Sequence, residues 1–148
     1  MEPIEKRSDI RSRQINASPK DVFAAMRDPD RVARWWGPAG FTNSFKVCEF
    51  TPGGQWTFIM HGPDGSNYPN ESVFAEIEAP GRVVIQHVNE PHFTLTITLE
   101  PKASGTLLTW LQEFENAEFA RQMDHILRPC NEQNLDRLTA EVLGTIIG

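Results

Sequence analysis

Cysteine is scarce in this sequence, since Cys48 and Cys130 are the only two among 148 residues. Two cysteines can form neither the disulfide framework of a small secreted domain nor a four-cysteine zinc site. We expect both thiols to be reduced and to pack as small hydrophobic groups. The sequence alone does not say whether the two side chains meet.

Long hydrophobic runs and an excess of positive charge are also missing. No apolar stretch approaches the ~18–20 residues that a membrane-spanning helix needs, and residues 1–7 carry charges where a signal peptide would be apolar. The chain has 14 Lys and Arg against 20 Asp and Glu, which gives a net charge of −6. Nucleic acids and acidic membranes bind clustered cationic side chains, so neither is an expected partner. We expect a cytoplasmic protein.

Motifs for phosphate binding and nucleophilic catalysis are absent as well. The sequence has no Gly-x-x-x-x-Gly-Lys, no Gly-x-Gly-x-x-Gly that opens a helix and no Gly-x-Ser-x-Gly. Gly53-Gly54 is interpreted as a turn, because a strand is expected after it. No two carboxylates stand out as a catalytic dyad, and the histidines lie outside metal-motif spacing. We expect no metal, no cofactor and no assignable catalytic residue.

The residues that are present are typical of one globular domain over residues 1–148. Hydrophobic residues make up 39% and charged residues 23% of the sequence, a balance that a folded domain of this length usually has. No internal repeat, low-complexity tract or Ser/Gly-rich linker marks a boundary. The oligomeric state is not indicated, so a monomer and a homodimer both stay open.

Two short helices are predicted after a first strand at residues 9–16. The Ser18 hydroxyl can cap the first helix by accepting a hydrogen bond from a free backbone N–H. The dipeptide Asp28-Pro29 ends this helix and begins the second, which Gly37 ends. The first third of the chain is therefore expected to run strand, helix, helix.

Six further strands are expected after these helices. Turn signals rich in Gly and Pro recur about every ten residues, as in an antiparallel meander. The clearest alternation begins at Phe93, where apolar residues on one face alternate with threonines on the other. The predicted strands cover residues 41–50, 55–61, 72–78, 82–89, 93–100 and 106–114.

A long amphipathic helix is predicted from the cap residue Asn116 to Gly144. Pro129 is expected to force a kink or a fresh start within it. An apolar stripe that includes Leu135 and Leu138 follows the proline. A one-sided sheet and an amphipathic helix bury their apolar faces against each other, so the fold class is α+β.

Five short motifs occur in an order typical of a known family. They read Ala17-Ser18-Pro19-Lys20-Asp21-Val22-Phe23, Asp28-Pro29, Arg34-Trp35-Trp36-Gly37-Pro38, Pro52-Gly53-Gly54-Gln55-Trp56 and Gly62-Pro63-Asp64-Gly65. Together they resemble the heat-shock-protein-90 ATPase activator homologues of the START-like or SRPBCC superfamily. The resemblance implies a helix-grip fold, in which a curved antiparallel sheet of about six to seven strands wraps around a long C-terminal helix. Asn70-Glu71-Ser72 departs from the family, whose members usually carry a glycine there.

The same resemblance implies a cavity between the sheet and the long helix. Small-molecule cavities combine bulky apolar walls with a few polar groups. Adjacent Trp35 and Trp36 cannot both face the same way on a helix, so we expect one to be buried and the other to lie near the entrance or the surface. The predicted lining residues are Trp35, Phe58, Met60, Phe74, Ile85, His87, Trp110, Met123 and Leu127.

The sequence predicts the surroundings of two histidines, His87 and His61. His87 shares a strand face with Val83 and Ile85, so it is either a polar group inside the cavity or a core histidine bonded to backbone or water. His61 stands at the end of a hairpin, where we expect a solvated turn residue.

Three functions follow from these observations. The first is a non-enzymatic domain that binds a small hydrophobic or amphipathic molecule. The second is a cyclase, dehydratase or hydrolase for a polyketide-like or aromatic substrate, with His87 as acid or base. The third, implied by the resemblance alone, is regulation of a chaperone ATPase. The family name comes from larger relatives with a further domain, so a small hydrophobic molecule is the expected partner rather than a chaperone.

Overall fold

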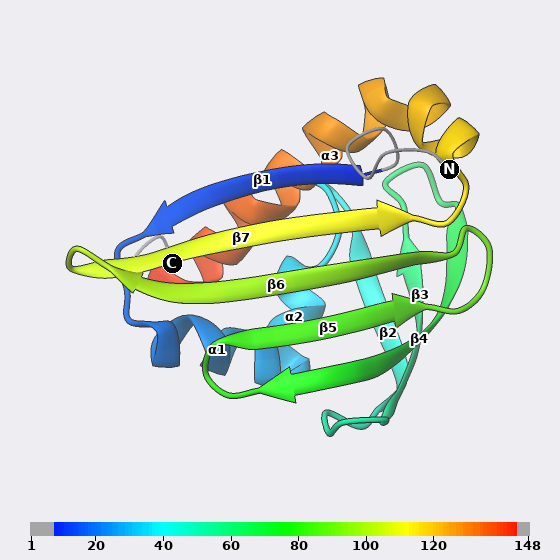
Figure 1. Ribbon diagram of the computed structural model, residues 1–148. Helices are drawn as coiled ribbons and strands as arrows, with labels where there is room; N and C mark the ends of the chain where they lie inside the picture. The colour runs from blue at the N-terminus through cyan, green and yellow to red at the C-terminus, as the bar shows by residue number, and fades with distance from the viewer. Residues whose placement is uncertain (1–7, 145–148) are drawn as a thin grey trace.

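The computed structural model describes residues 8–144. The segment of residues 1–7, on which the expected lack of a signal peptide rested, lies outside this range. In chain order the elements are β1 (Ser8–Ile15), α1 (Pro19–Arg27), α2 (Pro29–Trp35), β2 (Thr42–Cys48), β3 (Gln55–His61), β4 (Asn67–Glu78), β5 (Arg82–His87), β6 (Phe93–Lys102), β7 (Gly105–Phe114) and α3 (Ala117–Leu143) (Figure 1).

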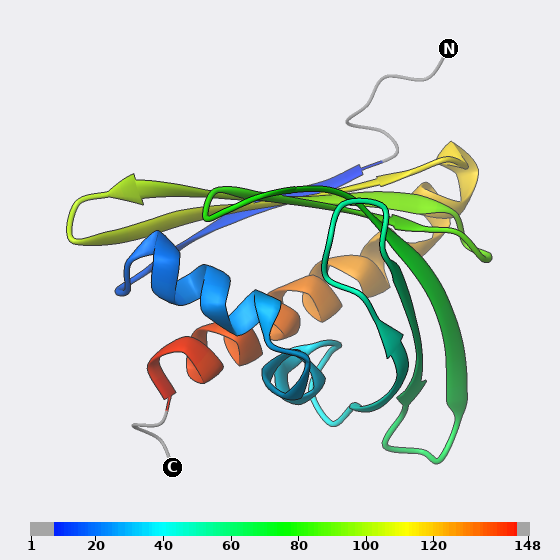
Figure 2. The same ribbon diagram turned by 90° about the horizontal axis from the view of Figure 1, so that it is seen from below.

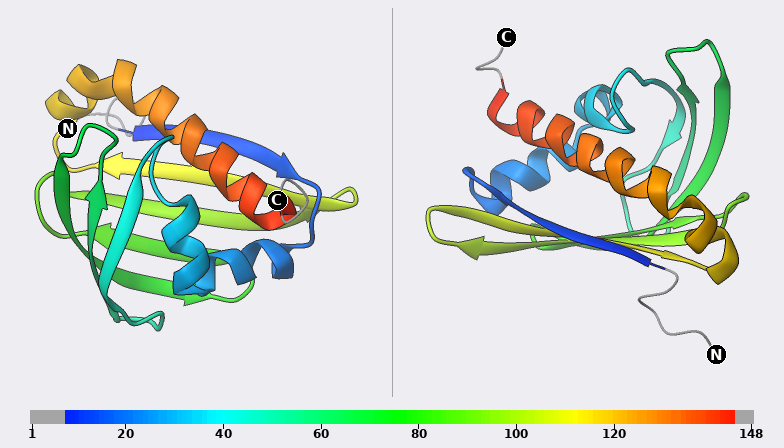
Figure 3. Two further views of the ribbon diagram at one scale, coloured as in Figure 1. Left: turned by 180° about the vertical axis from the view of Figure 1, so that it is seen from behind. Right: turned by 90° about the horizontal axis from the view of Figure 1, so that it is seen from above.

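The strands form one antiparallel sheet in the order β1-β7-β6-β5-β4-β3-β2. The N-terminal strand β1 pairs with the last strand, β7, and β2 forms the opposite edge. Figure 2 shows the sheet curling at its β2–β4 end, with all three helices on its concave side. Figure 3 shows α3 crossing that side diagonally. The predicted α+β helix-grip fold is confirmed, with seven strands in the sheet.

Local capping chemistry explains the two short helices. The Ser18 hydroxyl accepts a hydrogen bond from the Asp21 N–H at 3.2 Å, and the Asp28 carboxylate accepts one from the Asp30 N–H at 3.0 Å. A proline occupies the start of each helix, where its missing N–H costs nothing. The prediction that Asp28 ends one helix and begins the next is confirmed.

Strand β4 begins at Asn67, earlier than the predicted residue 72. The hairpin before it is tight, because the Gly62 N–H donates to the Ser66 carbonyl at 2.8 Å and His61 then pairs directly with Asn67. Pro69, which cannot donate to a ladder, weakens the strand signal in the sequence although it lies in register opposite Ile59. The segment that departs from the family pattern therefore lies inside β4.

Helix α3 runs without interruption from Ala117 to Leu143. Of the two alternatives predicted at Pro129, a kink or a fresh start, the fresh start is therefore excluded. The predicted cap is confirmed, since the Asn116 side chain accepts from the Phe119 N–H at 3.0 Å. Pro129 cannot donate to the carbonyl of His125, and His125 is exposed, so water can hydrate that carbonyl. Four of the five buried residues of α3 follow the proline: Asn131, Asn134, Leu135 and Leu138.

The core between α3 and the sheet is rich in aromatic rings. Trp56 stacks on Phe58 with ring centroids 4.3 Å apart and on Phe74 at 5.5 Å. Trp36 meets Trp56 edge-on at 4.8 Å and lies 6.1 Å from Trp110. These rings pack the curled end of the sheet and border the hollow described next.

Candidate functional site

A cavity of about 570 Å³ lies between the concave face of the sheet and α3. Its wall is mainly apolar and combines residues of β3 to β7, of α3 and of the segment between α2 and β2. The apolar part includes Trp36, Phe41, Met60, Phe93, Leu95, Trp110 and Leu127, and the polar part includes Asn70, His87, Gln112, Asn131 and Asn134.

The periodicity of the elements sets the direction of these side chains. On β7, Trp110 and Gln112 are two residues apart and therefore share the concave face. On α3, Leu127, Asn131 and Asn134 recur at helical spacing and lie on one side of the helix. The cavity thus lies where one face of the strands meets one stripe of the long helix.

The segment from Trp36 to Phe41 forms one wall of the cavity and is held in place by α3. Asn134 accepts a hydrogen bond from the Gly37 N–H at 3.2 Å and donates to the Trp35 carbonyl at 2.8 Å. The guanidinium of Arg137 donates to five carbonyls of this region and pairs with no carboxylate among the described residues. These five carbonyls belong to Arg34, Trp36, Gly37, Pro38 and Phe41, at distances of 2.6–3.2 Å.

Glycine is required at position 37 of this segment. Its φ of +95° is a conformation that residues with a side chain rarely adopt. A Cβ atom there would also lie 2.9 Å from the Met60 methyl carbon and 3.3 Å from the Phe41 Cβ. The missing side chain lets the segment approach β3 closely and narrows this end of the cavity.

Each ring nitrogen of His87 lies close to a protein oxygen at the cavity wall. Its Nδ1 lies 2.7 Å from the Pro91 carbonyl oxygen and its Nε2 lies 2.7 Å from the Asn70 side-chain oxygen. The Asn70 amide nitrogen is used elsewhere, since it donates to the Tyr68 carbonyl at 2.8 Å. The imidazole also stacks on Phe93 with ring centroids 4.5 Å apart. His87 is therefore a buried polar group at the cavity. Both neighbouring oxygens are acceptors, so the neutral ring, with its single N–H, donates to one of them.

Burial lowers the pKa of His87, against the hydrogen bond to the Pro91 carbonyl, which raises it. The unfolded chain therefore takes up this proton first as the pH falls. Above the ordinary pKa of 6.5, His87 is neutral in both the folded and the unfolded chain, and its full contribution to the unfolding free energy is present. This contribution is lost as the pH falls from 6.5 toward the lower pKa of the folded state.

A variant that cannot titrate at this position should lose this acid sensitivity. We expect His87→Gln to lose less unfolding free energy than the wild type between about pH 7.5 and about pH 5.5. Asp9, Glu132 and Glu141 do not interfere, because their lowered pKa values lie below ordinary values of 3.8 and 4.5. Urea unfolding across this range measures the difference, and equal losses in both proteins would contradict the role given to His87.

A polar network closes the cavity beside β1. The Asn131 amide nitrogen donates to Asp9 at 2.8 Å and to the Gln112 side-chain oxygen at 2.9 Å. Burial alone would raise the pKa of Asp9, but hydrogen bonds from Arg11 and Asn131 outweigh it and lower the pKa. The Asp9 carboxylate is thus charged at neutral pH and holds Asn131 in place from outside the cavity wall.

Neither cysteine lies in surroundings that would activate its thiol. Both cysteines are free, and burial raises the pKa of each thiol, so both are protonated at neutral pH. Cys130 lies on the cavity wall, whereas Cys48 borders a separate void of about 20 Å³. The thiolate is the nucleophilic form of cysteine, so neither is set up for covalent chemistry.

The structure brings four of the nine predicted lining residues to the cavity: Met60, His87, Trp110 and Leu127. Trp35, Phe74 and Ile85 border the void of about 20 Å³ instead, and Phe58 is buried among the aromatic rings. Met123, before Pro129 on α3, is half-buried and does not line the cavity. The part that these residues play in binding stays a prediction.

The expectation for the tryptophan pair is wrong in detail. Both rings are buried, and Trp36 rather than Trp35 faces the cavity. The reason is that α2 ends at Trp35 and Trp36 has extended backbone angles, with φ −69° and ψ 132°. Helical spacing therefore no longer sets the direction of Trp36. Trp35 turns into the core, where its indole N–H donates to the Ala25 carbonyl at 2.9 Å.

Several lining residues were missed in the sequence although a signal existed for some. The alternation that selects Trp110 on β7 also selects Gln112, and the stripe that selects Leu127 on α3 also selects Asn131 and Asn134. An expectation of mainly apolar lining does not select these polar side chains. Asn70 had no signal, since the sequence did not place it in a strand.

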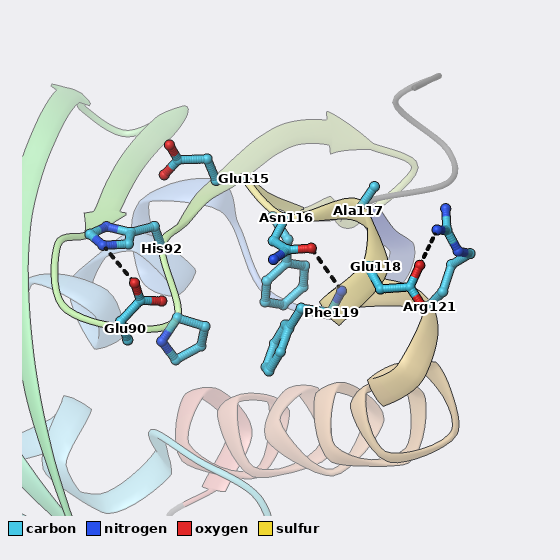
Figure 4. Close-up of a pocket in the computed structure, with 10 residues that line it drawn as sticks. Glu90, His92, Glu115, Asn116, Ala117, Glu118, Phe119 and Arg121 are labelled. Carbon is cyan, nitrogen blue, oxygen red and sulfur yellow. Dashed lines mark hydrogen bonds and ion pairs between the residues drawn. The ribbon is translucent and has the colours of Figure 1, made fainter. Parts of the chain in front are cut away.

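A second hollow lies outside the cavity, at the start of α3, and is open to solvent (Figure 4). Figure 4 shows His92 beside Glu90 on one side and Arg121 paired with Glu118 on the other. Its polar side chains are exposed, and its charged groups include two ion pairs at the surface, so nothing in this hollow indicates a binding site.

Within residues 8–144, no three His, Cys, Asp or Glu side chains lie close enough to hold a metal ion. The helices of the same range are all too short or too polar to cross a membrane.

Comparisons with known proteins agree with this fold. The family described as Activator of Hsp90 ATPase homolog 1-like protein matches residues 16–142. A protein from Nitrosomonas europaea superposes with a TM-score of 0.84 at 18% identity, covering 96% of this chain and 97% of that one. A protein from Arthrobacter aurescens has a TM-score of 0.84 at 27% identity, covering 96% and 89%. The AHSA1-like protein from Aeromonas hydrophila has a TM-score of 0.76 at 19% identity, covering 95% of each chain. No curated protein matches the sequence.

Proposed function

The chain belongs to the family of Activator of Hsp90 ATPase homolog 1-like proteins, and from that premise we propose that it binds a small hydrophobic or amphipathic molecule between the sheet and α3. The observation that carries the proposal is the cavity of about 570 Å³. Sites for small molecules usually have volumes of about 300–1,000 Å³.

The composition of the wall supports this function. Rings and aliphatic side chains such as Trp36, Phe93 and Leu127 cover most of it, so a ligand gains affinity by removing apolar surface from water. A few polar groups, among them His87 and Asn131, can orient the ligand. The wall segment itself is anchored by Arg137, so the site is largely formed before a ligand arrives.

The arrangement of His87 favours binding over catalysis. A general acid or base must reach the proton that it transfers. Both ring nitrogens of His87 already lie 2.7 Å from protein oxygens, and Asn70 would have to move before a substrate could reach Nε2. No other buried titratable side chain among the described residues points to acid–base chemistry in this cavity.

The experiment is a melting-temperature screen with small lipids, flavonoids and polyketide-like aromatics. A ligand at 100 times its dissociation constant should stabilise the folded state by about 2.7 kcal/mol. Leu127→Trp should abolish the stabilisation, because the larger ring fills the cavity that Leu127 lines. Ile126→Trp is the matched control, since Ile126 is exposed on the same helix and its ring would project into solvent.

Two outcomes would contradict the proposal. The first is a panel in which no compound shifts the melting temperature of the wild type. The second is a compound that stabilises the Leu127→Trp variant as much as the Ile126→Trp variant, since it would bind somewhere other than the cavity.

A further inference from the structure

A charge that lies outside the cavity sets the orientation of two amides on the cavity wall. Arg11 holds the charged Asp9 carboxylate with two hydrogen bonds, from Nε at 2.8 Å and from Nη2 at 2.7 Å. A carboxylate accepts hydrogen bonds and donates none, so the Asn131 amide turns its nitrogen toward Asp9, at 2.8 Å. The same nitrogen donates to the Gln112 side-chain oxygen at 2.9 Å. The charge on Asp9 therefore fixes which atoms of both amides stay free.

The free atoms are the Gln112 side-chain nitrogen, a donor, and the Asn131 side-chain oxygen, an acceptor. Neither atom makes a hydrogen bond within residues 8–144. Both side chains are 8% exposed and line the cavity. Both free atoms also keep accessible surface. In the described part of the chain, the unpartnered side-chain atoms that are closed off completely are Asn43 Oδ1, Trp56 Nε1 and Trp110 Nε1.

The register of the sheet places the Gln112 nitrogen on the cavity side. Gln112 lies between Asp9 of β1 and Leu95 of β6. Its oxygen is turned toward Asn131, which is bonded to Asp9, and the nitrogen of an amide points away from its oxygen. Leu95 lines the cavity, so the nitrogen faces the space that a ligand would fill.

A ligand at this end of the cavity has to match both free atoms. Water would otherwise hydrate them, and displacing water by a group that cannot reproduce its hydrogen bonds loses affinity. The ligand therefore needs an acceptor for Gln112 and a donor for Asn131. Because the two amides share a hydrogen bond of 2.9 Å, neighbouring atoms of one group can serve both. A cyclic amide carries a C=O and an N–H in this arrangement.

The charge of the wall favours a neutral ligand. Of the described residues that line the cavity, none is Lys or Arg, and Glu90 is the carboxylate among them. The carboxylate of Asp9 stands behind Asn131 and adds a second negative charge near this end. An anionic ligand would therefore be buried without a cation, which is costly.

We propose that Gln112 and Asn131 form a polar subsite that selects neutral ring compounds with a cyclic amide. The ligand's carbonyl oxygen accepts from the Gln112 amide, and its N–H donates to the Asn131 oxygen. This inference rests on the proposed function and adds the ligand's chemical class. The rings of Trp36 and Trp110, 6.1 Å apart on the same wall, offer flat apolar surface to the rest of the ring system.

Oxindole, 2-indanone and indane are matched probes with nearly the same bicyclic outline. Oxindole carries the C=O and the N–H, 2-indanone carries only the C=O, and indane carries neither. In the NMR spectrum of the wild type, oxindole and 2-indanone should move a side-chain N–H resonance of Gln112 downfield, as hydrogen bonding does, whereas indane should not. Oxindole should bind more tightly than 2-indanone, because its N–H finds the Asn131 oxygen. Without that acceptor, burying the N–H would make oxindole the weaker of the two.

Gln112→Met removes the amide and keeps the length of the side chain. It should weaken the binding of oxindole and of 2-indanone about two- to tenfold, the value of one hydrogen bond, and change indane binding less than about twofold. The control is Leu127→Met, an apolar exchange on the same wall. It should change the binding of all three probes by similar factors.

Asp9→Asn tests Asp9 as a positioning residue. An asparagine at this position can donate as well as accept, so it no longer fixes the direction of the amides of Asn131 and Gln112. The ratio of 2-indanone affinity to indane affinity should fall toward its value in Gln112→Met. A role of Asp9 in stability alone would lower the free energy of unfolding and leave this ratio unchanged, which would overturn the positioning role.

The outcomes separate this inference from the proposed function. If the probes bind, Gln112→Met affects them equally and the Gln112 resonances do not move downfield, the ligand class is wrong while the binding function stands. If indane-2-carboxylate binds the wild type more tightly than the three neutral probes, the argument from charge is overturned. If no compound of the wider panel binds either, the proposed function fails together with the inference.

Discussion

Arg137→Met is expected to lower the free energy of unfolding by about 3–5 kcal/mol, because one charged donor group serves five backbone carbonyls. Methionine fills similar space but donates nothing, so carbonyls such as those of Gly37 and Pro38 lose their partner in a partly buried site. The wall segment that starts at Trp36 should also loosen, so affinity for any ligand of the cavity should fall. Urea unfolding and ligand titration measure the two effects.

The matched control for this variant is Arg128→Met on the same helix. Arg128 is 64% exposed, and its ion pair within residues 8–144 is with Asp124, four residues away. Exposed ion pairs of this kind contribute about 0–1 kcal/mol. A loss in Arg137→Met no larger than that in Arg128→Met would show that Arg137 does not hold the segment.

Leu138→Ala is the second variant with a large expected effect, a loss of about 2–5 kcal/mol. Leu138 is 0% exposed and packs into the main core cluster from α3. Its removal takes apolar surface out of the core and leaves a hole that rigid neighbours cannot fill. Leu138 does not line the cavity, so ligand affinity should stay close to that of the wild type at temperatures where the variant is folded.

Ile126→Ala provides the control for this variant, because Ile126 is 42% exposed on the same helix. We expect its effect to stay within about 0.5 kcal/mol. Comparable losses in the two variants would contradict the division of α3 that the structure indicates. In that division, the turns after Pro129 stabilise the domain and the first half is more exposed.

Elements that depend on neighbours in the chain were predictable from the sequence. The two short helices follow from a capping residue at Ser18 and a turn at Asp28. The capping hydrogen bonds of these two side chains span only two or three residues. The strand after Phe93 follows from alternation alone. The packing of the curved sheet around the long helix does not follow from local chemistry. It could be predicted only from the motifs that resemble the family.

The details of the cavity depend on contacts between distant residues, and these were not predictable. Arg137 donates to carbonyls about a hundred positions earlier in the chain, and no local sequence pattern predicts such a hydrogen bond. Trp36 faces the cavity because the helix stops one residue before it, and a helix end is uncertain by one or two residues in any sequence. Asn70 lies beside His87 because β4 begins at Asn67 and so includes Asn70, whereas the sequence predicts a strand only from residue 72.

The central claim is that a ligand occupies the space between the sheet and α3, and its most direct test is the location of a bound compound. Intermolecular nuclear Overhauser effects should connect a compound found in the screen to the Met60 methyl group and to the indole rings of Trp36 and Trp110. Contacts to Phe119 in the open hollow at the start of α3, with none to these three residues, would contradict the account.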